Sequence, residues 1–268
     1  MGPIPPATGS VEQSSPAPTR IEVLYRDDAV VAVAKPAGRI VVPGRSGAAA
    51  EVSLRDQLAV ELGQRVFVVH RLDRGTSGVL VFALTAAAHR ALSMAFERHQ
   101  ADKRYWALCR GSLIGSGEVD RALVPIRGGK ARVARDGETN GKSSRTAWRA
   151  LERYGGFTAV EFRPRTGRLH QVRLHAAYLG HPLAVDPDYG GADSLRVHDL
   201  TGVTPARDDA DQVVVSRLTL HASSLHLRHP VTTKPLELSS PLPPDLSRAV
   251  ELLSTSGSGP LTPEGGEG

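Results

Sequence analysis

The stretch His70–Leu80 reads HRLDRGTSGVL and places a polar, glycine-containing loop directly in front of an apolar run. The residues before it, Val66–Val69, are also apolar, so we expect the loop to lie between two buried strands. One carboxylate in the loop, Asp73, lies between Arg71 and Arg74. Nearby cations favour the ionised carboxylate, which can act as a nucleophile or a general base. The same pattern also fits a surface ion pair in a tight turn, so the spacing alone leaves both interpretations open.

Strand-like and helix-like segments alternate on both sides of this loop. Upstream, Ile21–Tyr25 and Val30–Ala34 are short apolar runs around Asp27-Asp28, a pattern that predicts a β-hairpin. Further helices are predicted at 54–62, 86–100 and 169–179, and further strands at 79–84, 103–108, 158–162 and 213–227. Several strands joined by short turns, with few helices, favour an α+β fold with a mixed, largely antiparallel sheet over a doubly wound parallel sheet.

The composition is that of one globular domain, since 40% of the 268 residues are hydrophobic and 23% are charged. We place this domain at residues 21–250. Tails rich in Pro, Ser and Gly without an apolar period are expected at 1–20 and 251–268. The single cysteine, Cys109, cannot form an internal disulfide, which fits a reducing compartment. Neither a secretion signal nor an apolar run of about 20 residues is apparent, so a cytoplasmic protein is expected.

The charge balance is modestly basic, with 33 Lys and Arg against 28 Asp and Glu and a net charge of +5. Such a balance is compatible with a polyanionic partner such as RNA or DNA, but many soluble enzymes share it. Aromatic residues make up only 4% of the chain, which argues against an RNA-binding surface built on stacked aromatic rings.

The loop around Asp73 resembles the signature loop of the RluA-type pseudouridine synthases. Further blocks resemble that family in the family's own order, which is more specific than any single motif. These blocks are 25–28, 35–38, 103–105, 142–146, 166–175, 180–183, 186–190, 220–222 and 229–230. Departures from the family pattern occur at Ala34, Leu169 and Val185. None of these three positions is an expected catalytic residue.

The resemblance implies the pseudouridine synthase catalytic fold and a uridine isomerase. It makes Asp73 the catalytic carboxylate, which either adds to the sugar of the target uridine or removes a sugar proton to give a glycal. It implies that Tyr105 packs on the target base and serves in a later proton step, and that Arg173 pairs with Asp73. Arg71 would help to displace the base, and Leu174 would form an apolar wall of the pocket.

The resemblance also implies the partners. The substrate would be rRNA or tRNA, the chain would act as a monomer, and no metal or organic cofactor would take part. Further RNA-binding residues are expected at Arg74, Arg168, His170 and Lys35. A different class of function stays open beside this one, because a non-catalytic RNA-binding or ribosome-assembly factor could keep the same fold.

Three other motifs point to different chemistry. The segment 136–143 resembles a phosphate-binding P-loop, but Asp136 replaces its first glycine, so we expect a solvated loop. His170 and His175 are five residues apart instead of the four that place two zinc ligands on one helix face. Ser77 lacks the nucleophile-elbow context of hydrolases, and we expect its hydroxyl to support the Asp73 loop.

Overall fold

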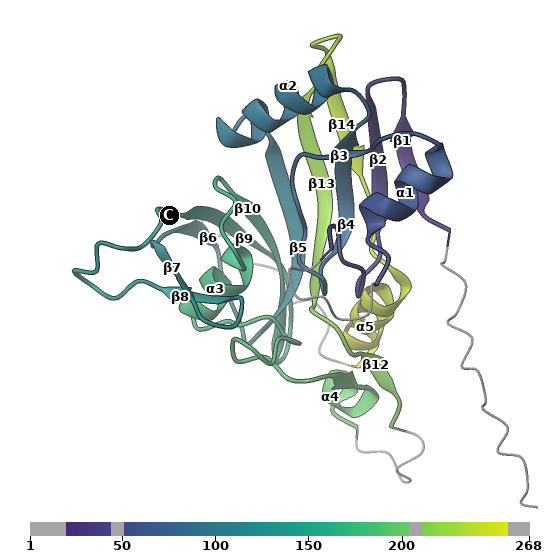
Figure 1. Ribbon diagram of the computed structural model, residues 1–268. Helices are drawn as coiled ribbons and strands as arrows, with labels where there is room; N and C mark the ends of the chain where they lie inside the picture. Colours follow the sequence, from purple (N-terminus) through teal and green to yellow (C-terminus); the bar gives the residue numbers. More distant parts are fainter. Residues whose placement is uncertain (1–19, 44–50, 204–210, 257–268) are drawn as a thin grey trace, which may run out of the picture.

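The computed structural model describes residues 20–43, 51–203 and 211–256. A ten-stranded sheet runs through the molecule in the order β1-β2-β4-β13-β5-β10-β9-β6, with β3 added to β4 and β14 added to β13 (Figure 1). All neighbouring strands are antiparallel except β4 and β13, which pair in parallel. The predicted α+β class with a mixed, largely antiparallel sheet is confirmed.

The strands are β1 Glu22–Arg26, β2 Val30–Lys35, β3 Phe67–Val68, β4 Ser77–Ala83, β5 Asp102–Arg110, β6 Ser116–Asp120, β7 Leu123–Ile126, β8 Lys130–Val133, β9 Arg145–Tyr154, β10 Phe157–Pro164, β11 Leu195–Arg196, β12 Val213–Val215, β13 Leu220–Arg228 and β14 Pro235–Ser239. The helices are α1 Leu54–Leu62, α2 Ala86–Glu97, α3 Gln171–Tyr178, α4 Val197–Thr201 and α5 Pro244–Thr255. Strands β7 and β8 form a separate hairpin, and β11 and β12 form another two-stranded sheet.

Helices cover both faces of the first half of the sheet. Alternate residues of a strand point to opposite faces, so Val79 and Val81 of β4 pack toward α2, and Leu80 and Phe82 pack toward α1. Every residue of β4 is buried, as expected for a central strand with a helix on each side. The strand that follows the Asp73 loop is therefore fixed by packing on both faces.

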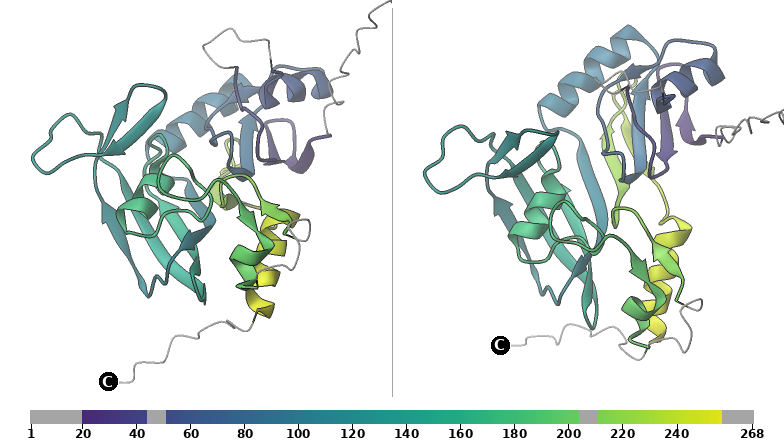
Figure 2. Two further views of the ribbon diagram at one scale, coloured as in Figure 1. Left: turned by 90° about the horizontal axis from the view of Figure 1, so that it is seen from below. Right: turned by 60° about the horizontal axis from the view of Figure 1, so that its bottom comes forward.

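The second half of the sheet is covered in the same way. On one face α3 packs Val172 and Ala176 against β5 and β10, and on the other face α5 packs Leu246 and Ala249 against the same strands. Figure 2 shows α3 and α5 on different sides of this half, with α4 beside α5. The Asp73 loop lies where the two halves of the sheet join, at the start of β4.

The observed elements differ from the predictions at several ends. Helix α2 ends at Glu97, because His99 adopts the left-handed conformation (φ 57°) that terminates a helix. Helix α3 begins only after His170, which has a φ of 54°. The predicted strand 213–227 is divided into β12 and β13.

The predicted end of the domain at residue 250 falls inside α5, which continues to Thr255. Of the predicted tails at 1–20 and 251–268, residues 1–19 and 257–268 lie outside the described residues. None of the helices in the described ranges is long and apolar enough to span a membrane.

Candidate active site

The Asp73 loop is fixed through its backbone. The Thr76 amide donates to the Asp73 carbonyl at 3.1 Å, and the Gly38 amide donates to the Arg74 carbonyl at 2.8 Å. Lys35 Nζ donates to the carbonyls of Arg74 and Thr76 at 3.1 and 2.7 Å. These bonds hold the loop while the side chain of Asp73 stays partly accessible.

Lys35 is a support of this loop and not an RNA contact. The side chain is almost fully buried, at 1% exposure, and its third hydrogen bond goes to the Pro36 carbonyl at 2.9 Å. The prediction that Lys35 binds RNA is therefore wrong, because a buried ammonium that donates to three carbonyls cannot reach a phosphate. Burial lowers the pKa of Lys35 to about 7, and the charge of Asp73 opposes this shift.

A cavity of about 860 Å³ opens beside the loop. Seven of the nine predicted site residues line it, namely Arg71, Asp73, Arg74, Tyr105, Arg168, His170 and Arg173. The exceptions are Lys35 and Leu174. Leu174 instead packs with Leu123 and Ala131 below the β7–β8 hairpin, so its predicted place in the pocket wall is wrong. Val172 and Leu220 provide apolar lining of the cavity.

The reactive groups in this cavity are not engaged by the protein. Within the described chain, neither the Asp73 carboxylate nor the Tyr105 hydroxyl has a hydrogen-bond or ion-pair partner. Burial raises the pKa of Tyr105, and the nearby charge of Asp73 raises it further, so the phenol is neutral at ordinary pH. Thr76 Oγ1, in the same lining, is a buried side-chain atom without a partner. An arriving ligand can therefore form hydrogen bonds with the Asp73 carboxylate and the Tyr105 hydroxyl.

Arg173 does not form the predicted ion pair with Asp73. Its guanidinium donates to both carboxylate oxygens of Asp186 at 2.6 and 2.7 Å and to Asp188 at 2.9 Å. Burial lowers the pKa of Arg173, but these carboxylates and the charge of Asp73 raise it by more. The net effect is a raised pKa. Arg173 thus places a fixed positive charge near Asp73 while Asp186 holds it in position.

The start of helix α3 lines the cavity, and hydrogen bonds from the loop after the helix hold it in place. His170, in its left-handed conformation before α3, forms a hydrogen bond through Nδ1 with the Tyr189 hydroxyl at 2.8 Å. The same hydroxyl accepts from the Ala131 amide of β8 at 3.1 Å, and Lys130 pairs with Asp188 at 2.6 Å. His170 lines the cavity, and these contacts fix its ring, while its contact with RNA stays a prediction.

The arginines at the rim are accessible. Arg71, Arg74 and Arg168 are exposed and line the cavity. Arg74 pairs with Glu51 at 3.0 Å, and Arg168 donates to the Ser143 carbonyl at 3.0 Å. The rim is therefore positively charged and open to a polyanion.

Two further lining residues were not predicted as site residues. His70 accepts from the Val81 amide at 3.1 Å and stacks on Phe96, and burial with the charge of Lys103 lowers its pKa to about 3. Lys103 donates to the Thr166 carbonyl at 2.8 Å, and burial lowers its pKa to about 8 although Asp102 opposes the shift. Both residues lie within sequence blocks that resemble the family. Their membership in these blocks could have identified them as site residues.

The residues of the alternative motifs have structural roles. Ser77 Oγ contacts His221 Nδ1 at 2.9 Å and accepts from Arg217 at 3.0 Å, which supports the loop as expected. His175 is buried, and its Nδ1 forms a hydrogen bond with the Thr146 hydroxyl at 2.8 Å. His170 instead bonds Tyr189, so the two histidines do not share a partner. The segment 136–143 is a loop between β8 and β9, as predicted.

Known proteins resemble this chain over most of its length. The family described as RNA pseudouridylate synthase matches residues 29–178. A ribosomal large subunit pseudouridine synthase D from Xanthomonas campestris is 36% identical over 244 residues, which cover 90% of this chain and 71% of that protein. A tRNA pseudouridine synthase C from Yersinia pestis is 36% identical over 231 residues, which cover 82% of this chain and 86% of that protein.

Two solved human structures share the fold. RNA Pseudouridylate Synthase Domain Containing 4 superimposes with a TM-score of 0.66 at 23% identity, covering 87% of this chain and 92% of its own. RNA Pseudouridylate Synthase Domain Containing 1 superimposes with a TM-score of 0.63 at 25% identity, covering 93% of this chain and 98% of its own.

Proposed function

The chain belongs to the family of RNA pseudouridylate synthases, and on that premise we propose that Asp73 is the catalytic carboxylate of this enzyme. One observation carries the proposal. The Asp73 carboxylate has no partner within the described residues, yet it lies on a loop held by Lys35 and lines the cavity with Tyr105 and Arg173. A fixed, unpaired carboxylate in a cationic cavity is suited to attack or to proton removal.

The uridine, the protein side chains and water account for every bond and proton in this reaction. The N1–C1′ bond breaks, the base turns, a C5–C1′ bond forms, and the proton lost from C5 is replaced by one gained at N1. Asp73 either adds to C1′ and is displaced by C5, or takes a sugar proton to give a glycal and later returns it. In both routes the carboxylate is regenerated, so the chemistry requires no metal, redox or organic cofactor.

Neighbouring residues have distinct tasks in this proposal. Arg173, held by Asp186, keeps a positive charge near the Asp73 carboxylate. Tyr105 packs on the target base, and its neutral hydroxyl relays the proton that leaves C5, because its oxygen accepts that proton while its own proton passes to water. Arg71 is exposed at the rim, where it can occupy the space that the base vacates when it leaves its stack.

We propose rRNA or tRNA as the substrate, because relatives with both kinds of name match this chain. The exposed Arg71, Arg74 and Arg168 would contact phosphates around the target. Such contacts make RNA binding weaker as the salt concentration rises.

The test uses tRNA and large-subunit rRNA transcripts that carry tritium at C5 of uridine, because isomerisation releases this tritium to water. The wild type is expected to release it, and Asp73→Asn to release it at least about 10³-fold more slowly. Asp28→Asn, a change of the same kind in the exposed turn between β1 and β2, serves as the control and should match the wild type. Equal rates for the Asp73 and Asp28 variants would disprove the role of Asp73.

Tyr105→Phe separates binding from chemistry at the same site. The ring that packs on the base remains, so the affinity for RNA should change by less than about threefold, whereas loss of the proton-transfer group should lower turnover by about 10²-fold or more. Unchanged turnover would show that the hydroxyl takes no part.

A further inference from the structure

We propose that a second cavity, between α1 and β3, is a subsite for a nucleotide that flanks the target uridine in the RNA. This inference rests on the proposed function, since it concerns how the same enzyme holds its substrate. The cavity measures about 400 Å³, within the range of about 300–1,000 Å³ typical of small-ligand sites.

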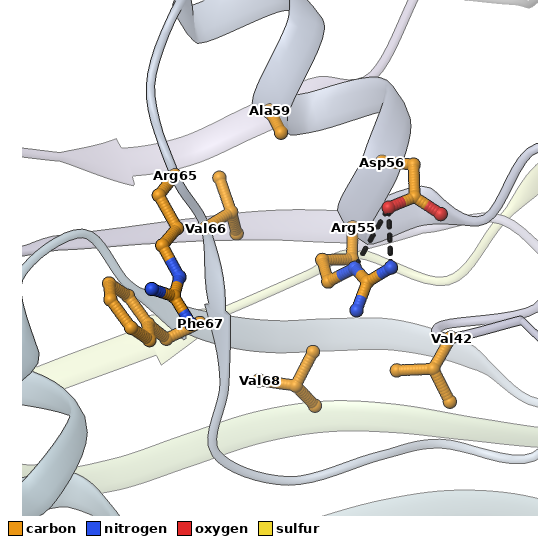
Figure 3. Close-up of a pocket in the computed structure, with 8 residues that line it drawn as sticks. All are labelled: Val42, Arg55, Asp56, Ala59, Arg65, Val66, Phe67 and Val68. Atoms are coloured by element: carbon orange, nitrogen blue, oxygen red, sulfur yellow. Dashed lines mark hydrogen bonds and ion pairs between the residues drawn. The ribbon is translucent and has the colours of Figure 1, made fainter.

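The cavity combines an apolar floor with a cationic rim. Val42, Val66 and Val68 provide apolar lining. Arg65 and Arg55 lie at two sides of the cavity, Arg65 against Phe67 and Arg55 beside Asp56 (Figure 3). A nucleotide has the matching chemistry, because its base is flat and largely apolar on its faces while its phosphate is anionic.

Arg65 is the cation best placed to meet a phosphate. It is exposed, and no carboxylate of the described chain lies within ion-pair distance of it. Its guanidinium carbon is held 4.6 Å from the centre of the Phe67 ring, and His89 stacks on the same ring at 5.2 Å. Arg65 and His89 both lie against the Phe67 ring, so this ring is not free to stack on a base. The group that can contact a ligand here is the guanidinium of Arg65.

The second arginine is largely neutralised. Arg55 donates to Asp56 at 2.6 and 2.9 Å, and Asp56 also accepts from the Ser53 hydroxyl at 2.6 Å. The charged lining groups, Arg55, Arg65 and Asp56, leave one net positive charge, which is centred on Arg65. The floor offers valine side chains and no matching set of hydrogen-bond groups, so the subsite would accept any base.

The cavity lies next to the active-site cavity. Val42 and Val68 line both cavities. Val68 precedes Asp73 by five residues, a length of chain that spans at most about 18 Å. An RNA strand whose target uridine lies at Asp73 can therefore reach the subsite with a nucleotide only a few positions away.

The test is a charge reversal with a matched control. Arg65→Glu changes the subsite, and Arg248→Glu makes the same change of net charge on α5, where Arg248 is exposed. The probes are fluorescein-labelled tRNA and large-subunit rRNA transcripts, and their dissociation constants are measured by anisotropy between 50 and 200 mM salt. Arg65→Glu should weaken binding about tenfold and make the logarithmic salt dependence shallower by about 0.7, the loss of one single-strand phosphate contact. Arg248→Glu should change affinity by less than about twofold.

Trimmed RNAs locate the contact. With a transcript shortened to remove the flanking nucleotides, Arg65→Glu and the wild type should bind equally well. The inference is wrong if Arg65→Glu and Arg248→Glu bind the long transcripts alike, or if the defect of Arg65→Glu persists on the trimmed RNA.

The tritium-release assay on the same transcripts keeps this inference apart from the proposed function. A wild type that releases no tritium from any transcript contradicts the proposed function, whereas the binding comparison of the two variants still decides whether the subsite exists.

Discussion

The ion pair between Arg173 and Asp186 shows how one residue can set the charge next to a reactive group. Their side chains are 5% and 1% exposed, and two hydrogen bonds join them. A bidentate pair fixes both the position and the plane of a guanidinium. The positive charge near Asp73 therefore depends on Asp186, which itself does not line the cavity.

Removal of this partner should cost both stability and activity. Asp186→Asn removes the buried one of the two carboxylates that pair with Arg173 and leaves the ion pair with the partly exposed Asp188, so we expect the free energy of unfolding in urea to fall by about 2–4 kcal/mol. Turnover should fall as well, because the guanidinium is less firmly held. The control is Asp120→Asn, whose pair with Arg145 is largely exposed and should contribute less than about 1 kcal/mol. Equal effects of the two substitutions would contradict this account.

Single residues also mark the limit of prediction from the sequence. The resemblance brought Asp73, Tyr105 and Arg173 to one cavity, but it gave the wrong partner for Arg173 and the wrong surroundings for Lys35 and Leu174. These contacts join segments far apart in the chain, and a motif specifies residue types without specifying their neighbours. Lys35, for example, bonds a carbonyl 41 residues away.

Among the elements, the parallel pair β4 and β13 determines where the Asp73 loop ends. Gly78 lies at this pairing with a φ of 114°, and a β-carbon built there would lie 2.2 Å from the Ala222 carbonyl oxygen. Backbone atoms cannot move aside as a flexible side chain can. The close approach of the two strands thus requires glycine at this position.

Gly78→Ala should therefore be strongly destabilising, by about 3 kcal/mol or more in the free energy of unfolding. Gly156→Ala provides the comparison, because the turn between β9 and β10 leaves open space around that position and its φ is not positive. We expect the second substitution to be close to neutral. Similar unfolding curves for both variants would show that the strands can separate at Gly78 without cost.

Elements with an apolar core face were the ones that the sequence predicted well. Helix α1 has the predicted bounds, and β4 follows from its apolar run. Strand β9 was not predicted, since only two of its ten residues are buried and its polar residues do not stand out from a loop. Helix α5 was also not predicted, although Pro244 at its start and the buried Leu246, Ala249 and Leu253 are a helical signal in the sequence.

For the molecule as a whole, neutral histidines that are buried (His175 and His221) or half-buried (His70 and His170) link the fold to pH. Burial lowers the pKa of His70, His170, His175 and His221, and His70 reaches about 3. In the unfolded chain these groups take up a proton near pH 6.5, whereas the folded protein resists protonation. The unfolded state thus binds more protons below pH 6.5, so acid shifts the equilibrium toward unfolding.

The stability conferred by these histidines should be complete above pH 6.5 and decrease as the pH falls toward 3. His70 alone should lower the free energy of unfolding by about 1–2 kcal/mol between pH 6.5 and 5. Urea titrations at pH 7.5, 6.5 and 5 measure this, in a range where ordinary carboxylates remain ionised. A free energy of unfolding that stays constant or rises on acidification would contradict the neutral state of these rings in the folded protein.

The central claim concerns the whole enzyme acting on its RNA through Asp73. The most direct measurement maps pseudouridine in all rRNA and tRNA of a strain that lacks this gene, complemented with either the wild type or Asp73→Asn. We predict that at least one pseudouridine disappears on deletion, returns with the wild type and stays absent with Asp73→Asn. Return of the same pseudouridine with Asp73→Asn would contradict the account.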